Sequence, residues 1–206
     1  MLDAWQRKFP RDALGRVDRV GVATKAAAPE EVSQLLNSCG GASFGSGLYR
    51  IVHPSDLSAW HDRIHLAYPQ FKDCATCFGF DWLGRAFALD NKRLQSGQPR
   101  VIMFELGTGK ALEIPANLQS FHEEVLIENG EAALAISFHE KWLAAAGEAP
   151  NYKQCVGYQK PLFLGGDDEV WNLELSDLDV YWHVIGQLVR KTRGLPPGTP
   201  IRAVLD

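Results

Sequence analysis

The sequence predicts an α+β protein in which an antiparallel β-meander lies between helical segments. The region around residues 78–114 consists of four short β-prone runs, "CFGFDWLG", "RAFALD", "PRVIMFEL" and "KALEIP", separated by glycine-containing turns. This spacing is typical of consecutive hairpins. The segments on either side repeat their apolar residues at helical intervals. With 206 residues, 46% of them hydrophobic, the chain is long enough to bury a sizeable core.

Two helices and a strand are expected before the meander. A first helix is predicted over residues 30–39, because Pro29 and two acidic residues suit a helix N-terminus. The glycine-rich stretch "GGASFGSG" predicts a loop, followed by a strand over 48–52. No lysine and no helix follow this loop, so it does not fit a phosphate-binding P-loop. A second helix is predicted over 55–66, with Ser55 as its N-cap.

The stretch "DWLGRAFALD" is expected to form a hairpin whose turn is Leu83-Gly84. Asp81 and Arg85 flank that turn and are expected to pair across it. Trp82 is expected in the core. The interpretation leaves Asp81 and Asp90 free to face a partner.

Helices and strands are also expected after the meander. Apolar spacing predicts one helix around residues 118–125 and a longer one that includes residues 134–142. The loop that follows suggests a domain at 1–147 and a C-terminal segment at 148–206 that packs on it as one compact unit. In that segment "KPLFLGG" and "VWNLEL" are expected to be strands, and Ser176 is expected to start a capping box for a final helix.

Composition excludes several classes of protein. The formal net charge is −4 and the pI is about 5.9, which argues against direct binding of nucleic acid. No apolar run approaches the roughly 18–20 residues that cross a bilayer, and the N-terminus does not fit a signal peptide. We therefore expect a cytoplasmic protein whose four cysteines remain thiols.

One motif could carry metal chemistry. His61 and His65 share a helical face, and Cys74 and Cys77 form a C-x2-C pair, so four ligands for tetrahedral Zn²⁺ lie within reach. An alternative hypothesis is therefore a zinc-binding domain or small metalloenzyme at these residues. A catalytic zincin is disfavoured because Asp62 stands where the longer glutamate base is needed. No G-x-S-x-G elbow is present, and we expect no catalytic residues.

The sequence resembles a known family. "FGSGLYRIVHPSDLSAW" resembles a GAD-related N-terminal domain, and "GYQKPLFLGGDDEVWNLELSDLDVYWHVIGQL" resembles the domain that accompanies it in bacterial type VI secretion DNase-immunity proteins. The resemblance implies a SUKH-like α+β fold, a bent antiparallel sheet with helices around it. It also implies a cytoplasmic antitoxin that binds and neutralises a cognate secreted DNase toxin of a type VI secretion system, with no catalysis of its own. We expect no cofactor.

An acidic surface would suit such a partner, because nucleases bind DNA through cationic grooves. Acidic residues are concentrated in the C-terminal segment, where a tryptophan could serve as an anchor. The candidate partner-binding residues are Asp167, Asp168, Glu169, Trp171, Asp177 and Asp179.

Overall fold

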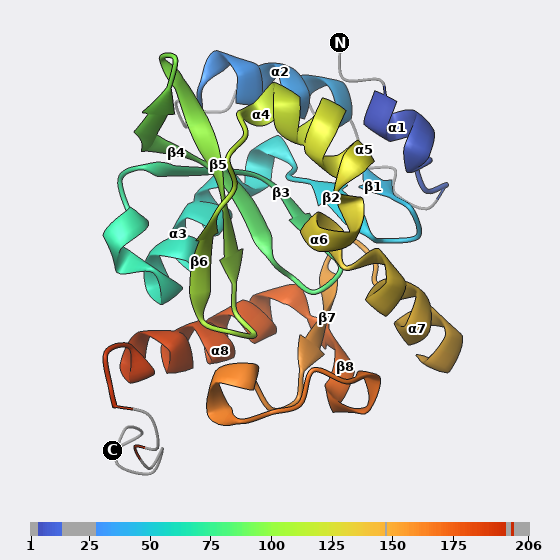
Figure 1. Cartoon of the computed structure of the whole chain (residues 1–206), viewed down its shortest axis with the longest axis vertical. Coiled ribbons are helices and arrows are strands. Elements are labelled where there is room, and N and C mark those ends of the chain that lie inside the picture. The colour runs from blue at the N-terminus through green and yellow to red at the C-terminus, as the bar shows by residue number, and fades with distance from the viewer. Residues whose placement is uncertain (1–3, 14–27, 147, 197–198, 200–206) are drawn as a thin grey trace.

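The computed structural model describes residues 4–13, 28–146, 148–196 and 199. Six strands form one antiparallel sheet in chain order, with each strand paired to the next (Figure 1). The strands are β1 (Ser43–Phe44), β2 (Tyr49–Ile51), β3 (Ala75–Asp81), β4 (Ala86–Gln95), β5 (Gln98–Glu105) and β6 (Lys110–Glu113). The predicted meander corresponds to β3–β6, and the α+β class is confirmed.

A separate antiparallel hairpin, β7 (Gln154–Tyr158) with β8 (Leu173–Asp177), belongs to the C-terminal segment. In Figure 1 this hairpin and the last helix lie together at the lower end of the molecule. The helices are α1 (Ala4–Lys8), α2 (Glu30–Cys39), α3 (Leu57–Ala67), α4 (Leu118–Ser120), α5 (Leu126–Glu128), α6 (Gly130–Leu134), α7 (Ile136–Ala146) and α8 (Leu178–Thr192). A π-helical turn, Phe121–Val125, joins α4 to α5.

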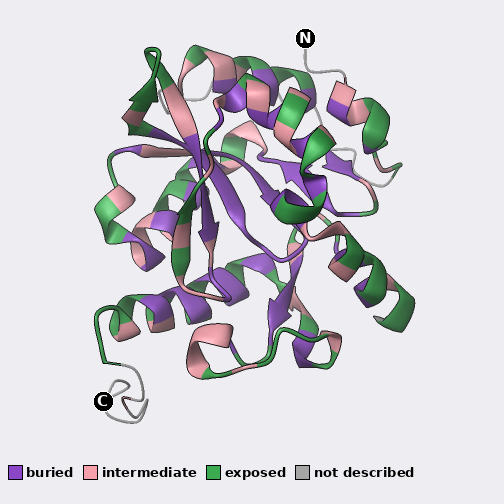
Figure 2. Ribbon diagram, viewed as in Figure 1, coloured by how far each residue is buried: buried purple, intermediate pink, exposed green. Residues whose placement is uncertain are grey.

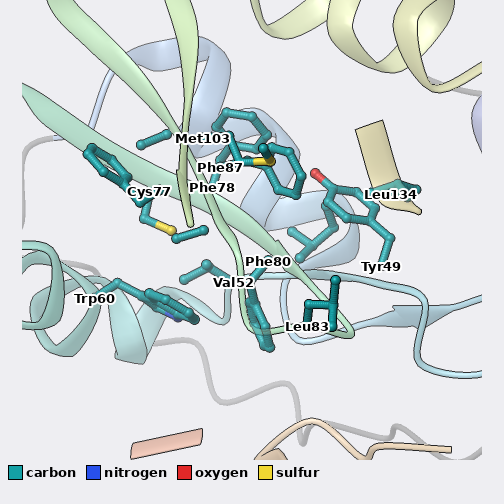
Figure 3. Close-up of a cluster of buried hydrophobic side chains, with 14 of the residues drawn as sticks. Tyr49, Val52, Trp60, Cys77, Phe78, Phe80, Leu83, Phe87, Met103 and Leu134 are labelled. Atoms are coloured by element: carbon teal, nitrogen blue, oxygen red, sulfur yellow. The ribbon is translucent and has the colours of Figure 1, made fainter. Parts of the chain in front are cut away.

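The core lies between the sheet and its helices. Most of β3, residues 86–90 of β4 and residues 101–104 of β5 are buried (Figure 2). Aromatic side chains fill the space around them (Figure 3). Trp60 of α3 is 1% exposed and packs against Phe80 of β3 and against Trp182 of α8. Aromatic residues bury large areas, so this cluster unites the sheet with both helices.

Three sequence predictions about elements are wrong. The predicted helix that includes residues 134–142 is interrupted at Ala135, whose φ of 51° ends α6 before α7 begins. "KPLFLGG" forms a 3-10 turn at Leu162–Leu164 instead of a strand, because Pro161 precedes it and Gly165 follows it in the left-handed region. "VWNLEL" becomes a strand only from its third apolar residue, as β8.

Both predicted serine caps are displaced by one residue or more. Ser55 lies inside a 3-10 turn (Pro54–Asp56) that precedes α3. The imidazole of His53 accepts a hydrogen bond from the backbone amide of Ser55. Asp177 caps α8, and its carboxylate accepts from Val180 N at 3.0 Å. An aspartate can accept from exposed helix amides as well as a serine can, so neighbouring capping residues compete for the same position.

The "DWLGRAFALD" hairpin is confirmed, but its charges are not free. The Asp81 carboxylate accepts from Leu83 N at 3.1 Å and from Arg85 Nε at 2.6 Å. Asp81 is 0% exposed and Asp90 is 8% exposed, so the expectation that they face a partner is wrong. Trp82 is buried as expected, and its indole donates to a backbone carbonyl of α6.

The C-terminal segment is bonded directly to the large sheet. Arg50 of β2 is 0% exposed, and its guanidinium donates to the carbonyls of Asn151, Gln154 and Asp81. Val156 N of β7 donates to a carbonyl at the β3–β4 turn at 2.7 Å. The proposed boundary at residue 147 stays a prediction, and that residue lies outside the described part of the chain.

Candidate functional site

Negative charge is concentrated in one stretch of the sequence. Residues 161–189 contain six acidic residues and no lysine or arginine, whereas the whole chain has a net charge of −4. The remainder of the chain therefore carries a net charge of +2. A local field of one sign attracts a partner of the opposite sign more strongly than total charge suggests.

Three of these acids, Asp167, Asp168 and Glu169, lie on one loop, residues 165–172, which we call the acidic loop. This loop joins the 3-10 turn after β7 to β8 and lies at the lower edge of the molecule in Figure 1. All three acidic residues are exposed. The side chains of Asp167 and Glu169 make no hydrogen bond or ion pair with any described residue. They are therefore available to a partner.

Asn172 fixes the acidic loop from inside. It is 3% exposed. Its Nδ2 donates to Lys160 O at 2.9 Å and to Asp167 O at 2.8 Å, and its Oδ1 accepts from Lys160 N at 3.0 Å. Sequence reasoning missed this residue, because an asparagine beside a tryptophan gives no sign that its side-chain amide will bond three backbone groups of residues 5 and 12 positions away.

Two glycines complete the shape of the loop. Gly165 has a φ of 77°, a conformation that L side chains rarely adopt. A Cβ on Gly166 would lie 1.8 Å from the carbonyl oxygen of Lys160, so no side chain fits there. The loop is thus held in one shape before a partner arrives, which lowers the entropy cost of binding.

Trp171 stands on this loop with 68% of its surface exposed, the largest value among the exposed large hydrophobic residues of the described chain. An indole in water has a strong tendency to be covered by another surface. Tryptophan is also among the residues that most often dominate the energy of an interface. The predicted anchor is therefore placed where a protein partner could reach it.

The other three candidate acids have structural roles in the free protein. Asp168 accepts a hydrogen bond from the Tyr158 hydroxyl at 2.5 Å; burial, and then this bond, raise the pKa of Tyr158. Asp177 caps α8, as described above. Asp179 accepts from Arg63 Nε of α3 at 2.9 Å. The structure therefore divides the six candidates into free and internally bonded residues.

The four residues of the zinc hypothesis are not brought together. The rings of His61 and His65 lie side by side, 6.4 Å apart, on the outer side of α3. Cys74 and Cys77 are buried, and the Cys77 thiol donates to Gly79 O. Among the described residues, no group of three or more His, Cys, Asp and Glu side chains is placed to hold a metal ion.

The cysteines are also poor nucleophiles. Burial raises the pKa of Cys155 to about 12 and raises that of Cys77 further. Burial likewise raises the pKa of the Cys39 and Cys74 thiols. Because the thiolate is the reactive form, none of these four side chains is prepared for covalent catalysis.

Comparisons with known proteins bear on the same region. Residues 116–189 match the family described as T6SS immunity protein Tdi1, C-terminal. The resemblance to type VI secretion immunity proteins is thus confirmed over this range, which includes all six candidate residues. A search of curated proteins gave no match.

The fold is similar to a solved structure, the crystal structure of Atu4351 from Agrobacterium tumefaciens. The TM-score is 0.54 with 14% sequence identity, over 97% of this chain and 96% of that one. Identity this low shows a shared fold alone. No helix among the described residues has the length and apolar character needed to span a membrane.

Proposed function

We propose, from the type VI secretion immunity family that residues 116–189 match, that this chain is a cytoplasmic immunity protein. It would bind a cognate secreted toxin and neutralise it without catalysing a reaction. We further propose that the toxin is a nuclease, as the sequence resemblance implies. The acidic loop would cover the cationic surface with which the nuclease holds DNA.

The acidic loop carries this proposal. It combines unpaired carboxylates, an exposed tryptophan and a backbone fixed by Asn172. Acidic side chains facing a cationic groove would speed encounter, while a central aromatic anchor would hold the complex once formed. A stable interface of this kind buries about 1,200–2,000 Å², so the loop would form only part of it.

The test uses a toxin recovered from the native host with the tagged protein as bait, and then purified. We expect one equivalent of the protein to abolish DNA cleavage and to form a one-to-one complex in calorimetry. Binding without loss of cleavage would contradict neutralisation. Inhibition of a toxin that does not cleave DNA or RNA would support the immunity function and reject the nuclease.

Charge reversal at Asp167 and Glu169 should slow association with the toxin. Both side chains are free in the uncomplexed protein, so lysine at these positions removes attraction without breaking an internal bond. We expect the association rate constant to fall about tenfold at low salt and the difference to shrink as salt rises. Stopped-flow fluorescence would measure both.

A matched control reverses Glu124 and Glu128, two exposed acids in and beside α5, which lies at the other end of the molecule in Figure 1. The net charge changes equally in both double variants. An equal slowing in the two variants would show that total charge, and not the acidic loop, guides the toxin.

Trp171→Ala should weaken the complex about 30-fold or more, because truncating an aromatic anchor commonly costs about 2 kcal/mol or more. Its side chain is 68% exposed, so the melting temperature should change little. Calorimetry of the variant, with Leu94→Ala as an exposed apolar control, measures this. Unchanged affinity would remove Trp171 from the interface.

A further inference from the structure

A groove open to solvent lies between α3 and α8, with a volume of about 530 Å³. Its two walls come from distant parts of the sequence, since α3 lies before the meander and α8 lies in the C-terminal segment. The residues that line it include Asp62, Arg63, Leu66, Asp179, Val180 and Val184.

The groove has an apolar surface where a helix would normally be polar. Val180 is 60% exposed and Val184 is 49% exposed. The two valines are four residues apart, so they lie on one face of α8. Leu66 of α3 is half-buried beside them. Contiguous exposed apolar side chains of this kind mark surfaces that another protein covers.

The charged side chains at the edge of the groove are one free acid, Asp62, and one ion pair, Arg63 with Asp179. Arg63 bonds to Asp179 across the helix pair and stacks on Trp60, with its guanidinium carbon 4.7 Å from the ring centroid. Asp62 makes no ion pair with any described residue and is exposed. The net charge presented along this edge is therefore negative, and Asp179 belongs to the same run of acids as the acidic loop.

We propose that the α3–α8 groove binds an amphipathic segment of the toxin. This inference rests on the proposed function. The segment would present apolar side chains to Val180 and Val184 and a basic side chain to Asp62. An amphipathic helix with anchors three or four residues apart fits a groove between two helices. The groove would thus add apolar contact to the electrostatic contact of the acidic loop.

Charge favours the toxin over a second copy of this chain as the occupant. A dimer built on the groove would bring together two edges that each carry a free Asp62 and a net negative charge. Like charges at an interface oppose association. A partner with a basic surface gains from the same arrangement.

The experiment replaces the two valines with glutamine, a good helix former that removes the apolar surface without changing the charge. Val180→Gln/Val184→Gln should raise the Kd for the inactivated toxin nuclease domain at least tenfold. The increase in Kd should come from faster dissociation, because the substitutions remove apolar contact with the toxin and leave the electrostatic attraction that guides association unchanged. Val180→Ala/Val184→Ala should show a smaller loss in the same direction, so the result does not depend on one variant.

Leu94→Gln is the matched control, since Leu94 is 58% exposed on β4 and outside the groove. Its Kd should equal that of the unmodified protein. Unchanged Kd in both valine variants, with slowed association in Asp167→Lys/Glu169→Lys, would overturn the groove and leave the proposed function standing. Failure of the unmodified protein to bind the toxin would overturn both. Sedimentation would show whether the unmodified protein is a dimer that the valine substitutions convert to a monomer. That result would assign the groove to a second copy of the chain instead.

Discussion

Replacing Arg50 with alanine is expected to lower the free energy of unfolding by about 3–5 kcal/mol, the range for breaking a buried charged network. The guanidinium is fully buried, lies 4.6 Å from the ring centroid of Phe80, and bonds three backbone carbonyls. Removing it takes one hydrogen-bond donor away from each of these carbonyls and leaves a cavity in the core, and both changes cost free energy. Denaturant unfolding followed by tryptophan fluorescence would measure the loss.

Arg50→Lys separates charge from geometry. A lysine keeps the positive charge but lacks the planar guanidinium whose separate N–H groups reach carbonyls of both segments. We therefore expect Arg50→Lys to be only slightly more stable than Arg50→Ala. Arg190→Ala serves as the control, because Arg190 is exposed on α8 and surface changes usually stay within about 0.5 kcal/mol. A loss below about 1 kcal/mol for Arg50→Ala would show that desolvation of the guanidinium cancels its bonds.

Acid is expected to destabilise the protein strongly through two buried histidines. Burial lowers the pKa of His122 to about 4, and burial followed by the nearby Arg50 guanidinium lowers that of His139 to about 4. His122 is held neutral by geometry: Nδ1–H donates to Leu118 O at 2.8 Å, so Nε2 accepts from the Tyr49 hydroxyl, 3.1 Å away. Protonation would leave that second nitrogen without an acceptor lone pair.

The direction of the pH effect follows from these lowered values. In the unfolded chain each histidine takes up a proton below about pH 6.5, whereas the folded protein resists protonation until about pH 4. The unfolded state therefore binds more protons in this interval, and stability falls as the pH drops. Each histidine is expected to cost about 2 kcal/mol by pH 5, relative to pH 7.5.

Urea unfolding at pH 7.5 and pH 5.0 measures this loss. His122→Gln should be less stable than the unmodified protein at pH 7.5, yet should lose about 2 kcal/mol less between the two pH values. His61→Gln, which removes an exposed imidazole, should leave the pH dependence of the unmodified protein in place. An equal loss in His122→Gln would rule out His122 as a source of the acid sensitivity.

Much of the fold could be predicted from local patterns. The turns at Leu83-Gly84 and Ser96-Gly97 fixed the hairpins of the meander, because Gly84, Ser96 and Gly97 adopt the positive φ that tight turns need. The helices α2 and α3 followed from apolar spacing. The predictions failed where one residue with a special conformation outweighed spacing, as at Ala135, or where Pro161 and Gly165 replaced a strand with a 3-10 turn.

The candidate site could be predicted in part. The acids and Trp171 were named as candidates from residue type and family resemblance, and the structure shows Trp171 exposed. Which carboxylates are free could not be predicted. Asp179 is bonded to Arg63, 116 positions away, and the loop conformation depends on Asn172 bonding to Lys160. Residue type and periodicity do not indicate which of these side chains will pair.

The α+β class, the meander, the concentration of acids and the resemblance to immunity proteins could all be read from the linear chain. These properties depend on residue type and short spacings, which the linear chain contains. The burial of Asp81, the free carboxylates of Asp167 and Glu169, and the groove with exposed valines between α3 and α8 became visible in the folded protein alone. Burial and pairing are set by neighbours brought close in space, because a side chain's solvent exposure depends on every element packed around it.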